Sequence, residues 1–185
     1  ALALALARGG LRVAVVDARP APDRTARGFD GRAYALAVAS RRLLEGVGVW
    51  PAVAAAAQPI LGITTRDGRP GEPPSPVFLH FDHAEIEEGP MGFMLEDRFL
   101  YAALLDAMQA ETGVTLVSGD AVVAQEIGPA AVAVTLGSGR RLTARLLVGC
   151  DGRGSGTAAS RWRAQASHGC LGVSASATPM PSSRA

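Results

Sequence analysis

The sequence predicts an α/β fold, because segments typical of helices and segments typical of strands alternate along its 185 residues. Two kinds of stretch carry this prediction most clearly. Residues 1–7 contain only alanine and leucine, which favour a helix, and Arg8 with the two glycines after it ends that helix. Residues 11–16 and 146–148 are short, largely apolar runs of the kind found in buried parallel strands, and an aspartate follows each of them closely.

The first two segments have the order of a dinucleotide-binding βαβ unit. In a complete unit, a first strand and a glycine-rich turn precede the helix, and an acidic residue after the second strand bonds the ribose hydroxyls of the ligand. Here the acid is present as Asp17, whereas no glycine-rich turn precedes residues 1–7. We therefore expect a chain that is truncated on its N-terminal side and a ribose-binding role for Asp17. An ordinary helix–strand pair is the alternative that these residues leave open.

The middle of the chain consists of short segments separated by turn-forming residues. Residues 23–34 are polar and contain glycine, and residues 67–76 contain four prolines and two glycines, so we expect loops in both places. The other segments are expected as helices at 35–46 and 51–58 and as strands at 60–66 and 77–81. Leu36, Leu43 and Leu44 are the candidates for burial in the first of these helices.

The second half of the chain opens with the clearest helical pattern. Across residues 97–112, four apolar side chains recur at a spacing that places them on one helix face: Leu100, Leu104, Leu105 and Met108. Strands are expected at 114–117, 121–127, 131–136 and 141–148. Residues 158–185 have no sustained period and are serine, alanine, arginine and proline in irregular order, so we expect a disordered tail there.

Composition and charge exclude several classes of function. The 18 basic and 17 acidic residues give a net charge of +1, so no nucleic-acid partner is expected. No apolar run approaches the roughly 18 residues of a membrane-spanning helix, and the composition predicts a soluble, cytoplasmic protein. The two cysteines have neither a disulfide framework nor a metal-ligand spacing, and we expect Cys150 to be a small buried residue. His80 and His83 could pair on a metal, but we favour a solvated loop and expect no metal.

Three separated stretches have an order and spacing that point to one family. They are the strand with its acid at 13–17, Gly31-Arg32-Ala33-Tyr34-Ala35-Leu36 before the next helix, and Leu147-Val148-Gly149-Cys150-Asp151-Gly152 near the end of the last strand. Over residues 1–157 the chain resembles the FAD-dependent aromatic hydroxylases, the para-hydroxybenzoate-hydroxylase-like monooxygenases. Within that superfamily, residues 32–36, 48–50 and 91–98 are most similar to the ubiquinone-biosynthesis hydroxylases.

The resemblance implies a partial Rossmann-like FAD-binding domain at 1–157. Part of a β-sheet substrate domain would be inserted at about 67–96, and residues 158–185 would lie outside the family pattern.

The resemblance also implies cofactor-binding residues. Asp17 would accept hydrogen bonds from the ribose hydroxyls, Arg32 would meet the pyrophosphate, and Arg98 would face FAD from the start of a helix. Asp151 and Gly152 would approach the ribitol–pyrophosphate region. Surface positions for the two arginines and a plain turn at Asp151-Gly152 are the alternatives left open. No catalytic side chain is assigned, because the flavin itself performs the oxygen chemistry.

The activity that the resemblance implies is hydroxylation of an aromatic ring with FAD, NADPH and O₂. The ubiquinone pathway would make the substrate a prenylated phenol, and it would add a peripheral association with the inner membrane or with a biosynthetic complex. Two alternatives stay open: another flavin-dependent oxidoreductase of reductase or halogenase type, and a remnant without enzymatic activity. As a fragment, the chain is expected to be inactive alone.

Overall fold

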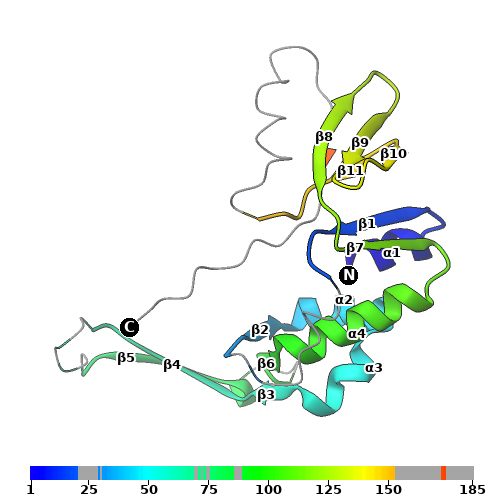
Figure 1. Cartoon of the computed structure of the whole chain (residues 1–185). Helices are drawn as coiled ribbons and strands as arrows, with labels where there is room; N and C mark the ends of the chain where they lie inside the picture. Colours follow the sequence, from blue (N-terminus) through cyan, green and yellow to red (C-terminus); the bar gives the residue numbers. More distant parts are fainter. Residues whose placement is uncertain are drawn as a thin grey trace.

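Most of the predicted helices and strands are present in the computed structural model (Figure 1). The structure describes residues 1–20, 29, 31–68, 71, 73, 76–85, 89–152 and 172–173. Helices alternate with strands along these residues, and both parallel and antiparallel strand pairs occur, which confirms the α/β class. Most of the predicted loop at 23–34 and of the predicted tail at 158–185 lies outside the described residues.

The predicted helix and strand at the start of the chain are confirmed. Helix α1 spans Leu2–Arg8, and strand β1 spans Val13–Asp17. β1 pairs in parallel with β7, Val114–Ser118, so that Asp17 stands opposite Ser118 at the last position of the pair. Two parallel strands need a long connection between them, and the whole middle of the chain supplies it.

A three-stranded antiparallel sheet lies in the lower part of the molecule in Figure 1. Its strands, in spatial order, are β2, Ala33–Ala37, then β6, Gly92–Glu96, then β3, Gln58–Ile60. The predicted helix at 35–46 is wrong at its start, because residues 35–37 belong to β2, and β6 is a strand that the pattern did not predict. Alanine favours a helix by only a fraction of a kcal/mol, so pairing along the whole of β2 outweighs that preference.

Three helices pack beside this sheet. Helix α2, Val38–Gly46, follows β2 directly, and α3, Trp50–Val53, continues into the short turn η2, Ala54–Ala56. Helix α4, Asp97–Ala110, begins immediately after β6. The helices predicted at 35–46, 51–58 and 97–112 are therefore all present, with shifted ends.

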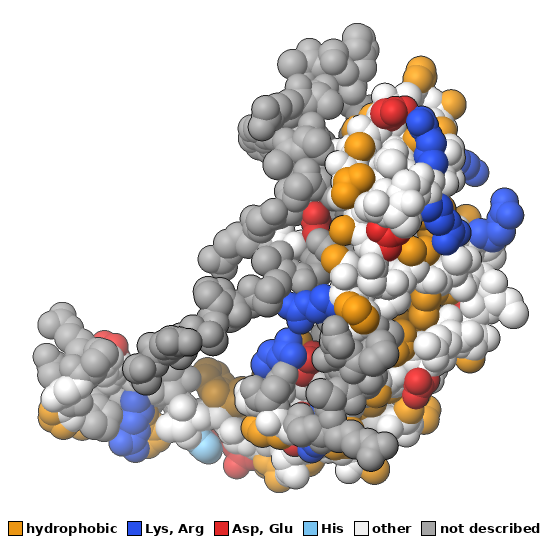
Figure 2. All heavy atoms as spheres, in the orientation of Figure 1, with side chains coloured by type: hydrophobic (Ala, Val, Ile, Leu, Met, Phe, Trp, Pro, Cys, Tyr) orange, Lys and Arg blue, Asp and Glu red, His pale blue; other side chains and the backbone are white. Residues whose placement is uncertain are grey.

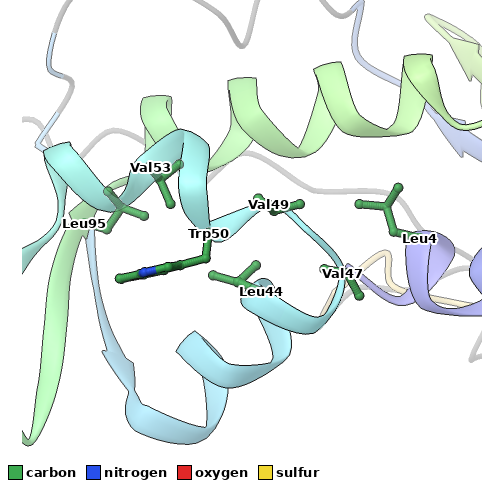
Figure 3. Packing of buried hydrophobic residues seen from close by; sticks show 7 residues of the cluster. All are labelled: Leu4, Leu44, Val47, Val49, Trp50, Val53 and Leu95. Carbon is green, nitrogen blue, oxygen red and sulfur yellow. The ribbon is translucent and has the colours of Figure 1, made fainter.

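The hydrophobic core lies between these helices and α1. Its buried members are Leu4, Leu44, Val47, Val49, Trp50, Val53 and Leu95 (Figure 3). Leu36 and three of the four residues predicted on the inner face of α4, namely Leu100, Leu104 and Met108, pack against this cluster. Leu43 is 52% exposed, so its predicted burial is wrong. Its neighbour Leu44 takes the inward position, and successive helical side chains point about 100° apart.

A hydrogen bond from Arg8 connects α1 to the end of α2. Its Nη1 donates a hydrogen bond of 3.2 Å to the carbonyl oxygen of Gly46. Gly48, just beyond, has φ +66, and a Cβ there would lie 2.7 Å from Arg8 Nη2. The positive φ favours a glycine at position 48, and a larger residue there would also displace the Arg8 guanidinium.

Strands β4, Gly62–Arg66, and β5, Phe78–Asp82, form an antiparallel ribbon that projects from the body of the molecule (Figure 1). Ile63 pairs with Phe81 and Thr65 with Leu79, so one face of the ribbon is largely apolar and exposed. On the other face, His80 Nδ1 lies 2.9 Å from the hydroxyl of Thr64. His80 is therefore part of a strand rather than of a solvated loop, and His83 opens the turn η3, His83–Glu85.

The last described strands form the upper part of the molecule in Figure 1. β8, Val122–Ile127, β9, Val132–Leu136, and β10, Arg141–Ala144, make an antiparallel sheet in the order β10-β9-β8. The single strand predicted at 141–148 is divided by a bend, and β11, Leu147–Val148, pairs instead with β12, Gly172–Val173. These two residues of β12 are the described part of the predicted tail.

Among the described helices, none has both the length and the apolar character that a membrane crossing requires.

Candidate functional site

Asp17 stands at the carboxyl end of the parallel pair β1–β7. Its Oδ1 accepts a hydrogen bond of 3.0 Å from the backbone N–H of Arg19. Its carbonyl oxygen accepts a hydrogen bond of 2.8 Å from the N–H of Gly119, which joins the ends of the two strands. Ligands of open α/β sheets bind outside the carboxyl ends of parallel strands, so this is the edge at which a ribose-binding acid is expected.

The structure brings Arg32 to the start of α4, where Arg98 also lies. Arg32 immediately precedes β2, and its carbonyl oxygen accepts a hydrogen bond of 3.0 Å from the N–H of Asp97. Its guanidinium Nη2 lies 3.4 Å from Asp97 Oδ2. The other oxygen of the same carboxylate, Oδ1, accepts a hydrogen bond of 2.8 Å from the hydroxyl of Tyr34. The pairing of β2 with β6 produces this arrangement, because it sets Ala33 opposite Glu96.

Arg98, the second residue of α4, is held on two sides. Its Nε donates a hydrogen bond of 2.6 Å to Glu96 Oε2. Its guanidinium carbon lies 4.6 Å from the centre of the Phe99 ring, which is a favourable cation–π distance. The side chain is about one third exposed, so Arg98 is a restrained, half-buried cation and not simply a solvated helix residue.

Asp151 and Gly152 follow β11 directly. Asp151 is only 5% exposed, and among the described residues it is the one charged side chain that is buried. Gly152 has φ +80, a backbone conformation that residues other than glycine rarely adopt. Among the described residues, apart from its chain neighbours, none has an atom within 4 Å of the place where a Cβ would stand.

Several of the elements that carry the predicted positions end on one side of the molecule in Figure 1. In Figure 1 the carboxyl end of β1, the trace that leaves β11 and the start of β2 all lie on the left of the view. Figure 2 shows basic and acidic side chains gathered on this face between the upper and lower parts of the molecule. Four of the five predicted cofactor-binding residues are charged, and these are Asp17, Arg32, Arg98 and Asp151.

Cys150 is exposed, so its predicted burial is wrong; β11 ends two residues earlier, and the chain has left the sheet by this point. Within the described part of the chain, no three side chains of His, Cys, Asp or Glu gather as metal ligands would.

Sequence reasoning missed Asp97, which contacts Arg32, and Tyr34, which contacts Asp97. Asp97 gave one signal, because it opens the strongest helical pattern of the chain. Tyr34 belongs to the stretch 31–36 that carries the family resemblance, but no local signal linked it to Asp97, since its hydroxyl reaches Asp97 only through the pairing of β2 with β6, across 63 positions of sequence.

Residues 1–181 match a family described as the FAD binding domain. Among curated proteins, the chain is 40% identical over 154 residues to the ubiquinone hydroxylase UbiL of Rhodospirillum rubrum, which covers 83% of this chain and 34% of that protein. It is 34% identical over 157 residues to the 3-demethoxyubiquinol 3-hydroxylase of Escherichia coli, which covers 84% of this chain and 39% of that protein. The chain thus spans well under half the length of these two relatives.

The fold is similar to that of solved monooxygenases. The p-nitrophenol 4-monooxygenase PnpA from Pseudomonas putida superposes with a TM-score of 0.64 at 18% identity, covering 83% of this chain and 38% of that one. At this identity the similarity concerns the fold alone, and it agrees with the fold expected from the sequence.

Proposed function

The chain belongs to the FAD-binding-domain family, and from this premise we propose that it forms part of an FAD-dependent monooxygenase that hydroxylates an aromatic ring. The observation that carries the proposal is the cluster at the start of α4, where Arg32 forms an ion pair with Asp97 and Arg98 forms one with Glu96. Two restrained guanidinium groups at one edge suit a doubly anionic group such as a pyrophosphate, which arginine binds through paired N–H donors.

The chemistry of the other predicted residues also fits FAD. Asp17 has a carboxylate at the end of a strand, which suits the ribose hydroxyls, and Gly152 has the positive φ that lets a backbone without a side chain approach a ligand closely. Asp151 would lie near the ribitol–pyrophosphate region of FAD. When bound, FAD supplies the redox and oxygen chemistry, while the residues of this chain would bind it, orient it and exclude water.

The names of the curated relatives support a narrower substrate class. One is named a ubiquinone hydroxylase and the other a 3-demethoxyubiquinol 3-hydroxylase. We therefore propose a prenylated phenol as the substrate and NADPH as the electron donor of the whole enzyme. A substrate with a long apolar tail partitions into lipid, which supports a peripheral association with a membrane or with a biosynthetic complex.

The direct test is FAD binding by the purified 185-residue chain, measured by quenching of flavin fluorescence. We expect Asp17→Ala to weaken FAD binding by on the order of 1–3 kcal/mol, roughly 5- to 150-fold, because two ribose hydroxyls lose their acceptor. The control is Asp106→Ala, which removes an exposed carboxylate from α4 and should leave the affinity unchanged. If the wild-type chain does not bind FAD at millimolar concentration, or if both variants bind equally well, the proposed role of Asp17 is wrong.

A further inference from the structure

We propose that Asp97 and Tyr34 are positioning residues for Arg32, which they hold in the orientation that meets the cofactor pyrophosphate. This inference rests on the proposed function, in which Arg32 contacts that group. Neither Asp97 nor Tyr34 needs to touch the cofactor. Their effect on binding would act through the guanidinium of Arg32.

The first step of the argument is that Asp97 holds Arg32 at both of its ends. The N–H of Asp97 donates a hydrogen bond of 3.0 Å to the carbonyl oxygen of Arg32, which fixes the backbone. Its Oδ2 lies 3.4 Å from Nη2, which restrains the far end of the side chain. An arginine side chain has many rotamers, so restraining it before the ligand arrives lowers the entropy lost on binding.

The second step concerns Tyr34, which orients the carboxylate of Asp97. Its hydroxyl donates a hydrogen bond of 2.8 Å to Oδ1, so the two carboxylate oxygens are divided between Tyr34 and Arg32. The position of Tyr34 is set by the sheet, because it pairs with Leu95, which is fully buried in the core. The paired strands β2 and β6 thereby restrict, through Tyr34 and Asp97, the orientation of the Arg32 guanidinium.

The third step is the direction in which the cation is presented. The side chain of Asp97 is 20% exposed, whereas that of Arg32 is 56% exposed. The carboxylate therefore lies on the inner side of the pair and the guanidinium on the outer side, where an anion approaches from solvent.

The charge of Asp97 also repels an approaching anion, so two effects compete. Water and salt screen charges at an exposed site, and this screening weakens repulsion across a longer distance more than it weakens an ion pair whose groups are in contact. On balance we expect the restraint to dominate. Tyr34→Phe tests the restraint without any change of charge, and Asp97→Asn tests both effects together.

The experiment compares three ligands with the full chain and its variants by isothermal titration calorimetry. FAD and ADP contain the pyrophosphate, whereas riboflavin does not. We expect Tyr34→Phe and Asp97→Asn each to weaken ADP and FAD binding about three- to tenfold and to leave riboflavin binding unchanged. In an Arg32→Ala background, Tyr34→Phe should cause no further loss, because its effect depends on Arg32. The matched control is Glu126→Gln, which removes a carboxylate from the exposed ion pair with Arg141.

The outcomes separate this inference from the proposed function. If the wild-type chain binds neither FAD nor ADP, or if Arg32→Ala has no effect, the proposed function of Arg32 fails and the inference fails with it. If Arg32→Ala weakens ADP binding but Tyr34→Phe does not, only the positioning role is overturned. Tighter ADP binding by Asp97→Asn, or an equal loss for riboflavin and ADP, would also overturn it. Thermal unfolding of each variant identifies a loss that comes from global destabilisation, which likewise counts against positioning.

Discussion

At the residue scale, the carboxylate of Asp120 joins the start of β8 to the turn that follows β9. Its Oδ1 accepts hydrogen bonds from the N–H groups of Ala121 at 2.9 Å and Ser138 at 3.2 Å. Its Oδ2 accepts a bond of 2.5 Å from the hydroxyl of Ser138. The Ser138 hydroxyl is the main reason that the pKa of Asp120 lies below its ordinary value of 3.8, since a hydrogen-bond donor stabilises the charged form.

This lowered pKa gives a pH-dependent prediction. The unfolded chain binds the proton of Asp120 more readily than the folded chain, so the bonds contribute stability above pH 3.8, and this contribution is lost as the pH falls through the folded-state pKa. We expect Ser138→Ala to raise the pKa of Asp120 toward 3.8, as measured by NMR titration of its side-chain carboxyl carbon. Ser118→Ala is the control, because that hydroxyl donates to the carbonyl oxygen of Arg19. An unchanged pKa in Ser138→Ala would contradict the assignment.

At the scale of elements, β6 links the hydrophobic core to the candidate site. Leu95 of β6 is 1% exposed and packs into the core, while the adjacent Glu96 holds Arg98. Phe93 of the same strand meets Trp50 edge-on with ring centres 5.0 Å apart. Alternate residues of a strand point to opposite faces, so burial of one face of β6 fixes where the strand delivers α4 and its charged start.

Truncation of Leu95 tests this dependence. We expect Leu95→Ala to lower the free energy of unfolding by about 2–5 kcal/mol, because it leaves a cavity among residues that are already closely packed. Leu43→Ala, at a leucine that is 52% exposed, should cost about 0.5 kcal/mol. Urea denaturation followed by tryptophan fluorescence measures both values. Equal destabilisation by the two changes would contradict the assignment of Leu95 to the hydrophobic core.

At the scale of the whole molecule, the chain corresponds to part of the length of its curated relatives. It spans 34% and 39% of the lengths of its two curated relatives. The ribbon of β4 and β5 leaves an apolar face uncovered, with Leu79 at 63% exposed. Oxygen chemistry on a flavin requires that water be excluded from the reduced cofactor.

The 185-residue polypeptide is therefore expected to show little or no hydroxylation when it is assayed alone with FAD, NADPH and a phenolic substrate. Any NADPH oxidation should release hydrogen peroxide rather than hydroxylated product. The assay follows NADPH absorbance, peroxide and product together. Product formation coupled to NADPH oxidation at roughly 1 s⁻¹ or faster, an ordinary enzyme rate, would show that these residues suffice for catalysis.

The sequence by itself determined the kinds of elements and much of the candidate site. Local signals fixed the helix α1, the strand β1 with Asp17 at its end, and the inner face of α4, because helical period, valine-rich runs and glycine stops depend on neighbouring residues only. The same local signals placed Asp151 and Gly152 directly after a short strand, and the structure has β11 there. The family followed from these pieces and their order.

Only the tertiary structure decided which distant residues meet. β6 is a strand because β2 pairs with it, and that pairing sets Tyr34 and Arg32 beside Asp97. The exposure of Cys150 was likewise decided by where β11 ends. The physical reason is that strand pairing and burial are contacts between segments far apart in the chain, and their free energy outweighs the small local preferences that a sequence pattern records.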